Sequence, residues 1–121
     1  MAKAALPPDD LLPLTPAVFH ILLALADGEK HGYAIMQEVA SLTNGDVKMG
    51  PGTLYGSIKR MLEAGLIRES GERPDPALDD ERRRYYCLTS RGEQVARAEA
   101  RRLESLLRAA HTKKLIGGTS G

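Results

Sequence analysis

The sequence predicts a mainly α fold with a small β-hairpin, in which a long helix forms the C-terminal part of the chain. Two observations predict this arrangement. Apolar residues recur at helical spacing in four segments of the 121-residue chain, and each segment begins or ends at a capping signal. Between the third and fourth segments, two short extended runs flank a polar loop that contains glycine and proline, which is typical of a β-hairpin.

The first two predicted helices lie near the N-terminus. One begins at Thr15, a hydroxyl cap that precedes proline in the first helical turn, and ends near Gly28. The other spans about residues 31–42, and Asn44-Gly45 follows it as a turn signal. The apolar faces of the two helices consist of Val18, Ile21, Leu22 and Leu25, and of Ile35, Met36, Val39 and Leu42.

The third predicted helix spans residues 51–65. It opens at Pro51, and it ends at Gly65, a residue type that is favoured just past a helix C-terminus. Its inner face consists of Leu54, Ile58, Met61 and Leu62.

Two strands and a last helix complete the chain. The strands are expected over residues 66–70 and 84–88, and the last helix runs from Ser90 to about Lys114 after a Thr89 cap. Three helices followed by a hairpin is the arrangement of a winged helix-turn-helix. In that fold the third helix enters the major groove of DNA, and the hairpin, or wing, lies along the backbone or the minor groove.

We therefore divide the chain into four parts. Residues 1–13 contain three prolines and two aspartates and are expected to form a flexible N-terminal arm. The winged helix-turn-helix domain spans residues 14–89, the long C-terminal helix spans residues 90–114, and a flexible tail spans residues 115–121.

The outward face of the third helix has the side chains that a DNA-reading helix needs. If the apolar residues face inward, hydroxyl, small and cationic residues are left outside. Hydroxyl groups can bond phosphates or base edges, and Lys or Arg can neutralise phosphates or read guanine. The alternative is an ordinary amphipathic helix at the protein surface. The residues expected outside are Thr53, Tyr55, Gly56, Ser57, Lys59 and Arg60.

Charge is patterned along this part of the chain, although the net charge of the whole chain is only +1. Residues 48–68 carry four basic side chains against one acidic side chain, and residues 69–81 carry one basic against six acidic. Arg82, Arg83 and Arg84 follow at once. The acidic hairpin tip would repel phosphate, so the arginines beside it are the better candidates for DNA contact.

Three segments of the sequence resemble the PadR family of bacterial transcriptional regulators. They are HGYAIMQEV from His31, MGPGTLYGSIKRMLEAGLI from Met49, and RRRYYCLTSRG from Arg82. The likeness covers about residues 14–92 in the same order and spacing. It implies a winged helix-turn-helix that binds palindromic operators as a homodimer, usually as a repressor. It also implies that the helix beginning at Pro51-Gly52 reads the DNA, and that Tyr33 contacts either this helix or a phosphate.

The outward face, the charge pattern and the resemblance together predict one set of DNA-binding residues. Part of the set lies on or before the third helix, and part lies on the returning strand of the wing. The predicted residues are Tyr33, Lys48, Gly52, Thr53, Tyr55, Ser57, Lys59, Arg60, Arg82 and Arg83.

The last helix carries a heptad-like apolar seam of about two heptads. We expect it to form a homodimer, because so long a helix cannot cover its seam on a small core and palindromic DNA requires a two-fold protein. The resemblance agrees, since small family members dimerise through a single C-terminal helix. The alternative is that the seam packs on its own chain. The predicted dimerisation residues are Ala96, Ala100, Leu103, Leu106, Leu107 and Ala110.

Other classes of protein fit the sequence less well. His20, His31 and His111 fall on three different helices without metal-ligand spacing, so we expect no enzyme and no cofactor. The single Cys87 allows no internal disulfide, and no signal peptide is recognisable, so we expect a cytoplasmic protein. Two alternatives stay open. One is a winged-helix module for protein–protein contact without DNA binding, and the other is a regulator that also binds a small-molecule effector of unknown identity.

Overall fold

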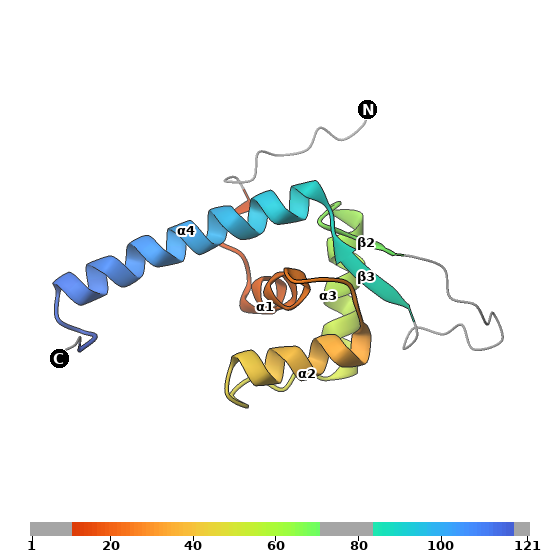
Figure 1. Cartoon of the computed structure of the whole chain (residues 1–121), viewed down its shortest axis with the longest axis horizontal. Helices are drawn as coiled ribbons and strands as arrows, with labels where there is room; N and C mark the ends of the chain where they lie inside the picture. The colour runs from red at the N-terminus through yellow and green to blue at the C-terminus, as the bar shows by residue number, and fades with distance from the viewer. Residues whose placement is uncertain (1–10, 71–83, 118–121) are drawn as a thin grey trace.

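The computed structural model describes residues 11–70 and 84–117. Within them the chain forms four helices and three short strands, with the long fourth helix above a compact unit of the other three (Figure 1). The elements in chain order are α1 Pro16–Leu25, β1 Lys30–His31, α2 Gly32–Leu42, α3 Pro51–Glu63, β2 Ile67–Glu69, β3 Tyr85–Leu88 and α4 Ser90–Thr112.

Local capping signals set the helix boundaries. The Thr15 hydroxyl accepts a hydrogen bond from the Val18 N–H (3.3 Å), and Thr89 caps α4 in the same way through the Gly92 N–H (3.0 Å). Past the end of α3, Gly65 adopts φ +77°, which a residue with a side chain rarely adopts. The predicted starts of α1 and α4 are therefore confirmed, and α3 ends where its glycine predicts.

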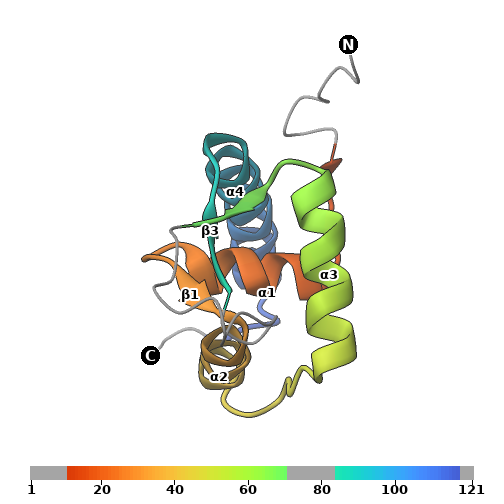
Figure 2. The same ribbon diagram turned by 90° about the vertical axis from the view of Figure 1, so that its right-hand side faces the viewer.

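Apolar side chains from all four helices and the sheet meet in one core around α1, which lies at the centre of the unit (Figure 2). Each fully buried aliphatic side chain contributes about 1.5–3 kcal/mol to folding. One predicted core position differs, because Leu42 at the end of α2 is 47% exposed. The largest fully buried side chains are Ile21, Leu22, Ile35, Leu54, Met61, Ile67, Val39 and Val95.

The sheet contains a strand that the sequence did not predict. β3 lies in the middle, with β2 on one side and β1 on the other, and both pairings are antiparallel. The sequence predicts a helix from about residue 31, whereas Lys30 pairs with Tyr86 and His31 with Tyr85. Two residues are too few to show an alternating pattern, so only the position of β3 reveals the strand.

α4 packs on the unit through its first half only. Its buried residues are Gly92, Val95, Ala98 and Glu99, after which the helix carries no buried residue up to Thr112. Gly92 allows α4 to lie close to the backbone of Leu66, because a Cβ at position 92 would overlap the Leu66 carbonyl oxygen. The second half extends beyond the other helices (Figure 1). In the described residues, no helix combines the length and hydrophobicity needed to cross a membrane.

Candidate nucleic-acid interface

α3 lies at the edge of the molecule, with one face in the core and the opposite face open (Figure 2). It packs against α1, α2 and β2. Leu54, Ile58 and Met61 are at most 2% exposed, so they fix the rotation of α3 about its own axis. Residues half a helical turn away from this apolar stripe must then face solvent.

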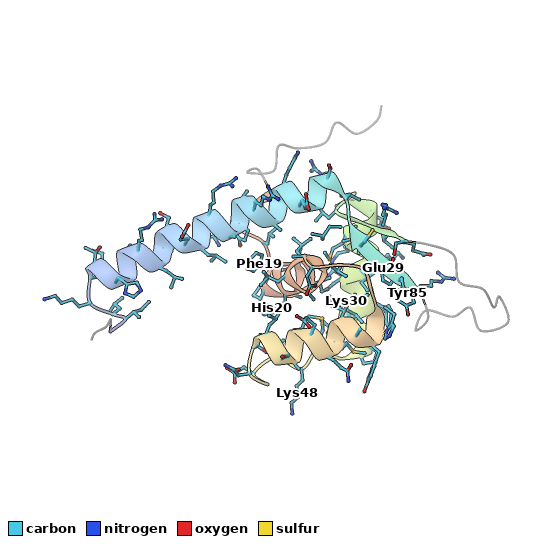
Figure 3. All side chains as sticks on the ribbon, in the orientation of Figure 1. Phe19, His20, Glu29, Lys30, Lys48 and Tyr85 are labelled. Carbon is cyan, nitrogen blue, oxygen red and sulfur yellow. The ribbon has the colours of Figure 1, made fainter. Side chains whose placement is uncertain are left out.

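Most of the residues predicted to contact DNA lie on this open side or next to it. On α3, Gly52, Thr53, Lys59 and Arg60 are exposed. Lys48, in the loop before α3, is exposed on the side of α2 that faces away from α4 (Figure 3). Tyr33, in the first turn of α2, is 57% exposed. Two helices and the loop between them thus present hydroxyl and cationic groups, which are able to bond phosphates and base edges.

Tyr55 is placed differently from our expectation of an outward side chain. It is only partly exposed, and its ring packs against the core. A Cβ at Gly32 would overlap the Tyr55 hydroxyl, so the phenol end lies directly against the backbone at the start of α2. Tyr55 therefore joins α3 to α2. Gly32 must be glycine because the Tyr55 hydroxyl occupies the space of its side chain. The HGY motif contains this glycine, but the motif alone does not show why it is needed.

The expectation that Ser57 faces outward is wrong. Ser57 is fully buried, because it stands three residues after Leu54 and four before Met61, which places it on the inner face of α3. Its hydroxyl oxygen accepts a hydrogen bond from Arg60 Nη2 (3.3 Å). Ser57 can act on a ligand only through Arg60, whose guanidinium it helps to orient.

The first turn of α3 leaves backbone donors available. Its N-cap, Gly50, has no side chain, and no side-chain cap hydrogen bond is present at this described helix start. The first intrahelical bond runs from the Leu54 N–H to the Gly50 carbonyl (2.9 Å). The N–H groups of Gly52 and Thr53 precede it, so they face the open end of the helix, where the helix dipole favours an anion.

The base of the wing is joined to the rest of the domain by polar contacts. The buried Ser70 hydroxyl donates to the Glu29 carboxylate, and the Ser70 N–H bonds the Tyr85 carbonyl (2.9 Å). The Tyr85 ring stacks edge-on against His31, with 5.3 Å between ring centroids. Figure 3 labels Glu29 and Tyr85, each of which bonds Ser70. Arg82 and Arg83 lie outside the described residues.

His31 has a role that its spacing did not indicate. Its Nδ1 accepts a hydrogen bond from the Ala34 N–H (3.1 Å), so the imidazole caps α2. Histidine is an unusual cap, which is why we expected it inside the helix. The acceptor position requires that Nδ1 carry no proton while the cap is formed.

The predicted dimerisation residues are divided between two environments. Ala96 packs against the core of its own chain. Leu106 and Leu107 are 55% and 53% exposed, Ala100 is exposed, and Leu103 and Ala110 are partly exposed. The second half of the seam thus carries large apolar side chains that residues 11–70 and 84–117 leave exposed.

Comparison with known proteins decides the family. A family model described as the transcriptional regulator PadR-like family matches residues 21–98, well over half of the chain. The chain belongs to the PadR-like family of transcriptional regulators. The matched region includes α2, α3, the sheet and the first part of α4. The family consists of transcriptional regulators rather than enzymes, and in the described residues no three His, Cys, Asp or Glu side chains group as metal ligands.

Two curated relatives are similar in sequence to this PadR-like chain. Transcriptional regulator Rv3488 of Mycobacterium tuberculosis is 35% identical over 101 residues, which cover 84% of this chain and 83% of that protein. An uncharacterised 37.1 kDa protein in transposon Tn4556 of Streptomyces fradiae is 35% identical over 86 residues. That match covers 71% of this chain but only 22% of the Streptomyces protein.

Solved structures share the fold. A PadR family transcription regulator from Clostridium difficile superposes with a TM-score of 0.65 at 20% identity, covering 81% of this chain and 97% of that one. RosR from H. salinarum superposes with a TM-score of 0.60 at 27% identity, covering 83% of this chain and 80% of that one. The predicted winged helix-turn-helix with a C-terminal helix is therefore confirmed.

Proposed function

We propose that this PadR-like chain is a cytoplasmic transcriptional repressor that binds a palindromic operator as a homodimer. The observation that carries the proposal is the open face of α3 in a chain of this family. The core fixes the inner side of α3, and the outer side presents backbone donors, a hydroxyl and two cations. A helix with this outer side matches the width and the donor–acceptor pattern of the major groove.

Each exposed residue has a proposed role. Lys59 and Arg60 neutralise phosphates or read guanine, and Thr53 bonds a phosphate or a base edge. Lys48 and the N–H of Gly52 bind backbone phosphate at the start of α3.

Tyr33, Arg82 and Arg83 act beside the reading helix, and Tyr55 has a structural role within it. Tyr33 bonds a neighbouring phosphate from α2. Arg82 and Arg83 bind phosphate from the wing. Tyr55 holds α3 against α2, rather than reading bases itself, because its hydroxyl lies against Gly32.

The dimer supplies the symmetry of the operator. Winged-helix domain 14–89 contacts one half-site, and helix 90–114 pairs with its copy through Ala100, Leu103, Leu106, Leu107 and Ala110. Support comes from the exposed leucines in the second half of α4, which water would otherwise surround. A two-fold dimer places two α3 helices on successive major grooves, about 34 Å apart.

The test is selection of bound sequences from a random duplex library by the purified full chain, followed by titration of the selected duplex against salt. A two-fold-symmetric site is expected. The logarithm of the binding constant should fall with the logarithm of the salt concentration, with a slope of about −0.9 per neutralised phosphate. Absence of enrichment, with weak and salt-insensitive binding, would contradict the proposal.

Two other functions are separated by the same experiment. A protein-contact module would bind duplex DNA weakly or not at all, and the exposed cations on α3 argue against it. An effector-responsive regulator would bind DNA in this assay and release it when the small molecule is added.

A further inference from the structure

The fold explains most of the described glycines, but it does not explain those at the start of α3. Nine glycines lie in the described residues. Gly28, Gly45 and Gly65 adopt φ between +77° and +146°, where a side chain is strained. Gly32 and Gly92 face the Tyr55 hydroxyl and the Leu66 carbonyl so closely that a Cβ would overlap them. These five positions require glycine for internal reasons, whereas Gly117, after α4, meets nothing within 4 Å.

Gly50, Gly52 and Gly56 have no such internal reason. All three have negative φ, and a Cβ at Gly50 or Gly52 would meet nothing within 4 Å. A Cβ at Gly56 would meet only Arg60 Nη1, at 3.8 Å, which is an ordinary van der Waals distance. The three glycines stand within residues 50–56, which form the N-cap and the first half of α3.

Gly56 is the most informative of the three, because it lies inside the helix. Glycine in a helix interior is less favourable than alanine by about the largest margin of any residue except proline. Among the described residues, no contact of Gly56 compensates for that cost. A partner outside the described residues would account for the space left open at this position.

The position of Gly56 on α3 indicates what kind of partner would lie against it. Leu54, Ile58 and Met61 face the core, and Gly56 stands two residues after Leu54, about 200° around the helix. Gly52, Lys59 and Glu63 share this outermost line. Exposed Lys59 and Arg60 follow Gly56 by three and four residues, so the bare backbone is flanked by cations. Gly56 itself is partly exposed, with Arg60 Nη1 3.8 Å from the position that a Cβ would take. Cations beside a partly exposed backbone favour a polyanion at close range, rather than an apolar partner helix.

We propose that Gly56 is the point of closest approach between α3 and the DNA, and that its missing side chain sets how deeply α3 enters the major groove. This inference rests on the proposed DNA-binding function. A methyl group at this position would hold the helix axis away from the base edges. Thr53 and Arg60 would then lose their base contacts, whereas looser phosphate contacts would persist.

The experiment compares Gly56→Ala and Gly56→Leu with the wild-type full chain, using the selected operator duplex and an unrelated duplex. We expect Gly56→Ala to raise the melting temperature by about 3 to 6 °C, because alanine favours the helix. Operator affinity should fall about tenfold or more, the size of the loss from one mismatched base pair. Gly56→Leu should bind the operator no better than the unrelated duplex. The matched control is Gly32→Ala, which should lower the melting temperature because Tyr55 blocks the added methyl group.

The outcomes separate the inference from the function on which it rests. Wild-type operator binding together with unchanged affinity in Gly56→Ala would overturn the role of Gly56 and leave the function intact. Wild-type protein without salt-dependent affinity for any duplex would overturn both. A protein partner captured by the wild type and lost in Gly56→Ala, with DNA binding unchanged, would also overturn the inference.

Discussion

The Leu14 N–H donates a hydrogen bond to Glu99 Oε2 (3.1 Å), across 85 positions of sequence. Glu99 lies on the inner face of α4 and is 2% exposed, and Arg102 Nε donates to its other oxygen, Oε1 (2.6 Å). A buried carboxylate is tolerated only when hydrogen bonds and a counter-charge satisfy it. This carboxylate therefore joins α4 to the segment that leads into α1.

Removing the Glu99 carboxylate should destabilise the protein. In Glu99→Ala, the Leu14 N–H loses its acceptor and Arg102 loses its partner, at a cost of about 1–3 kcal/mol of unfolding free energy. Glu99→Gln keeps an acceptor for Leu14 and should cost less. Urea denaturation at one fixed protein concentration measures the unfolding free energy of both variants. Glu93→Ala, on the exposed side of α4, is the control. If Glu99→Ala unfolds at the same urea concentration as the control, the hydrogen bonds of Glu99 add nothing to the stability of the protein.

The same contact makes part of the stability depend on pH. The hydrogen bond from Arg102, together with that from Leu14, lowers the pKa of Glu99 below its ordinary value of 4.5. A lowered folded-state pKa means that this stabilisation is fully present above pH 4.5 and is lost as the pH falls through the folded-state pKa. The difference in unfolding free energy between wild type and Glu99→Gln should thus be constant near neutral pH and shrink below pH 4.5. A difference that grows in acid would contradict this assignment.

Substitutions at Lys59 and Ser57 should affect different properties, DNA binding in the first case and stability of the fold in the second. Lys59→Ala removes an exposed cation, so operator affinity should fall, the salt slope should decrease by about one, and the melting temperature should not change. Ser57→Ala removes a buried hydroxyl that holds Arg60, so it should lower the melting temperature while the salt slope stays the same. The reverse pattern in the two variants would show that the rotation of α3 has been misassigned.

Tyr55 should prove to be a packing residue. Tyr55→Ala removes a ring that covers Gly32 and contacts the core, and we expect a loss of about 2 kcal/mol or more of unfolding free energy. Tyr55→Phe keeps the ring and should retain most of both the stability and the operator affinity. Thermal melts and the operator titration measure the two properties. Loss of binding in Tyr55→Phe at unchanged stability would instead indicate a direct contact between the hydroxyl and DNA.

Charges placed on the second half of α4 should separate the dimer. Leu103→Glu with Leu107→Glu puts two carboxylates on a surface that the proposed dimer buries, so the protein should sediment as a monomer and bind only half-sites weakly. Ser105→Glu, on a different side of α4, is the control and should remain dimeric. A double variant that is still a dimer would place the interface elsewhere on the molecule.

Local signals in the sequence were enough to predict the order of the helices and most of their boundaries. The caps at Thr15 and Thr89 accept from backbone N–H groups three residues ahead, so the helix starts depend on neighbours along the chain. The Thr89 hydroxyl also donates to the Gly65 carbonyl (2.6 Å), a long-range contact that the capping signal does not reveal. Helical spacing likewise predicted the core stripe Leu54, Ile58 and Met61. The same spacing places Ser57 inside, and its polar side chain alone suggests the wrong, outward position.

The tertiary structure alone decided the contacts between residues far apart in sequence. The pairing of Lys30 with Tyr86, the closeness of Tyr55 to Gly32, and the hydrogen bond from Leu14 to Glu99 follow from how packed elements meet. A strand of two residues, a glycine and one glutamate have no periodic pattern of their own. What the sequence by itself determined is the set of helices and their apolar faces, because those depend on neighbours along the chain. What the packing decided is which polar groups end up beside one another, because that depends on the whole core.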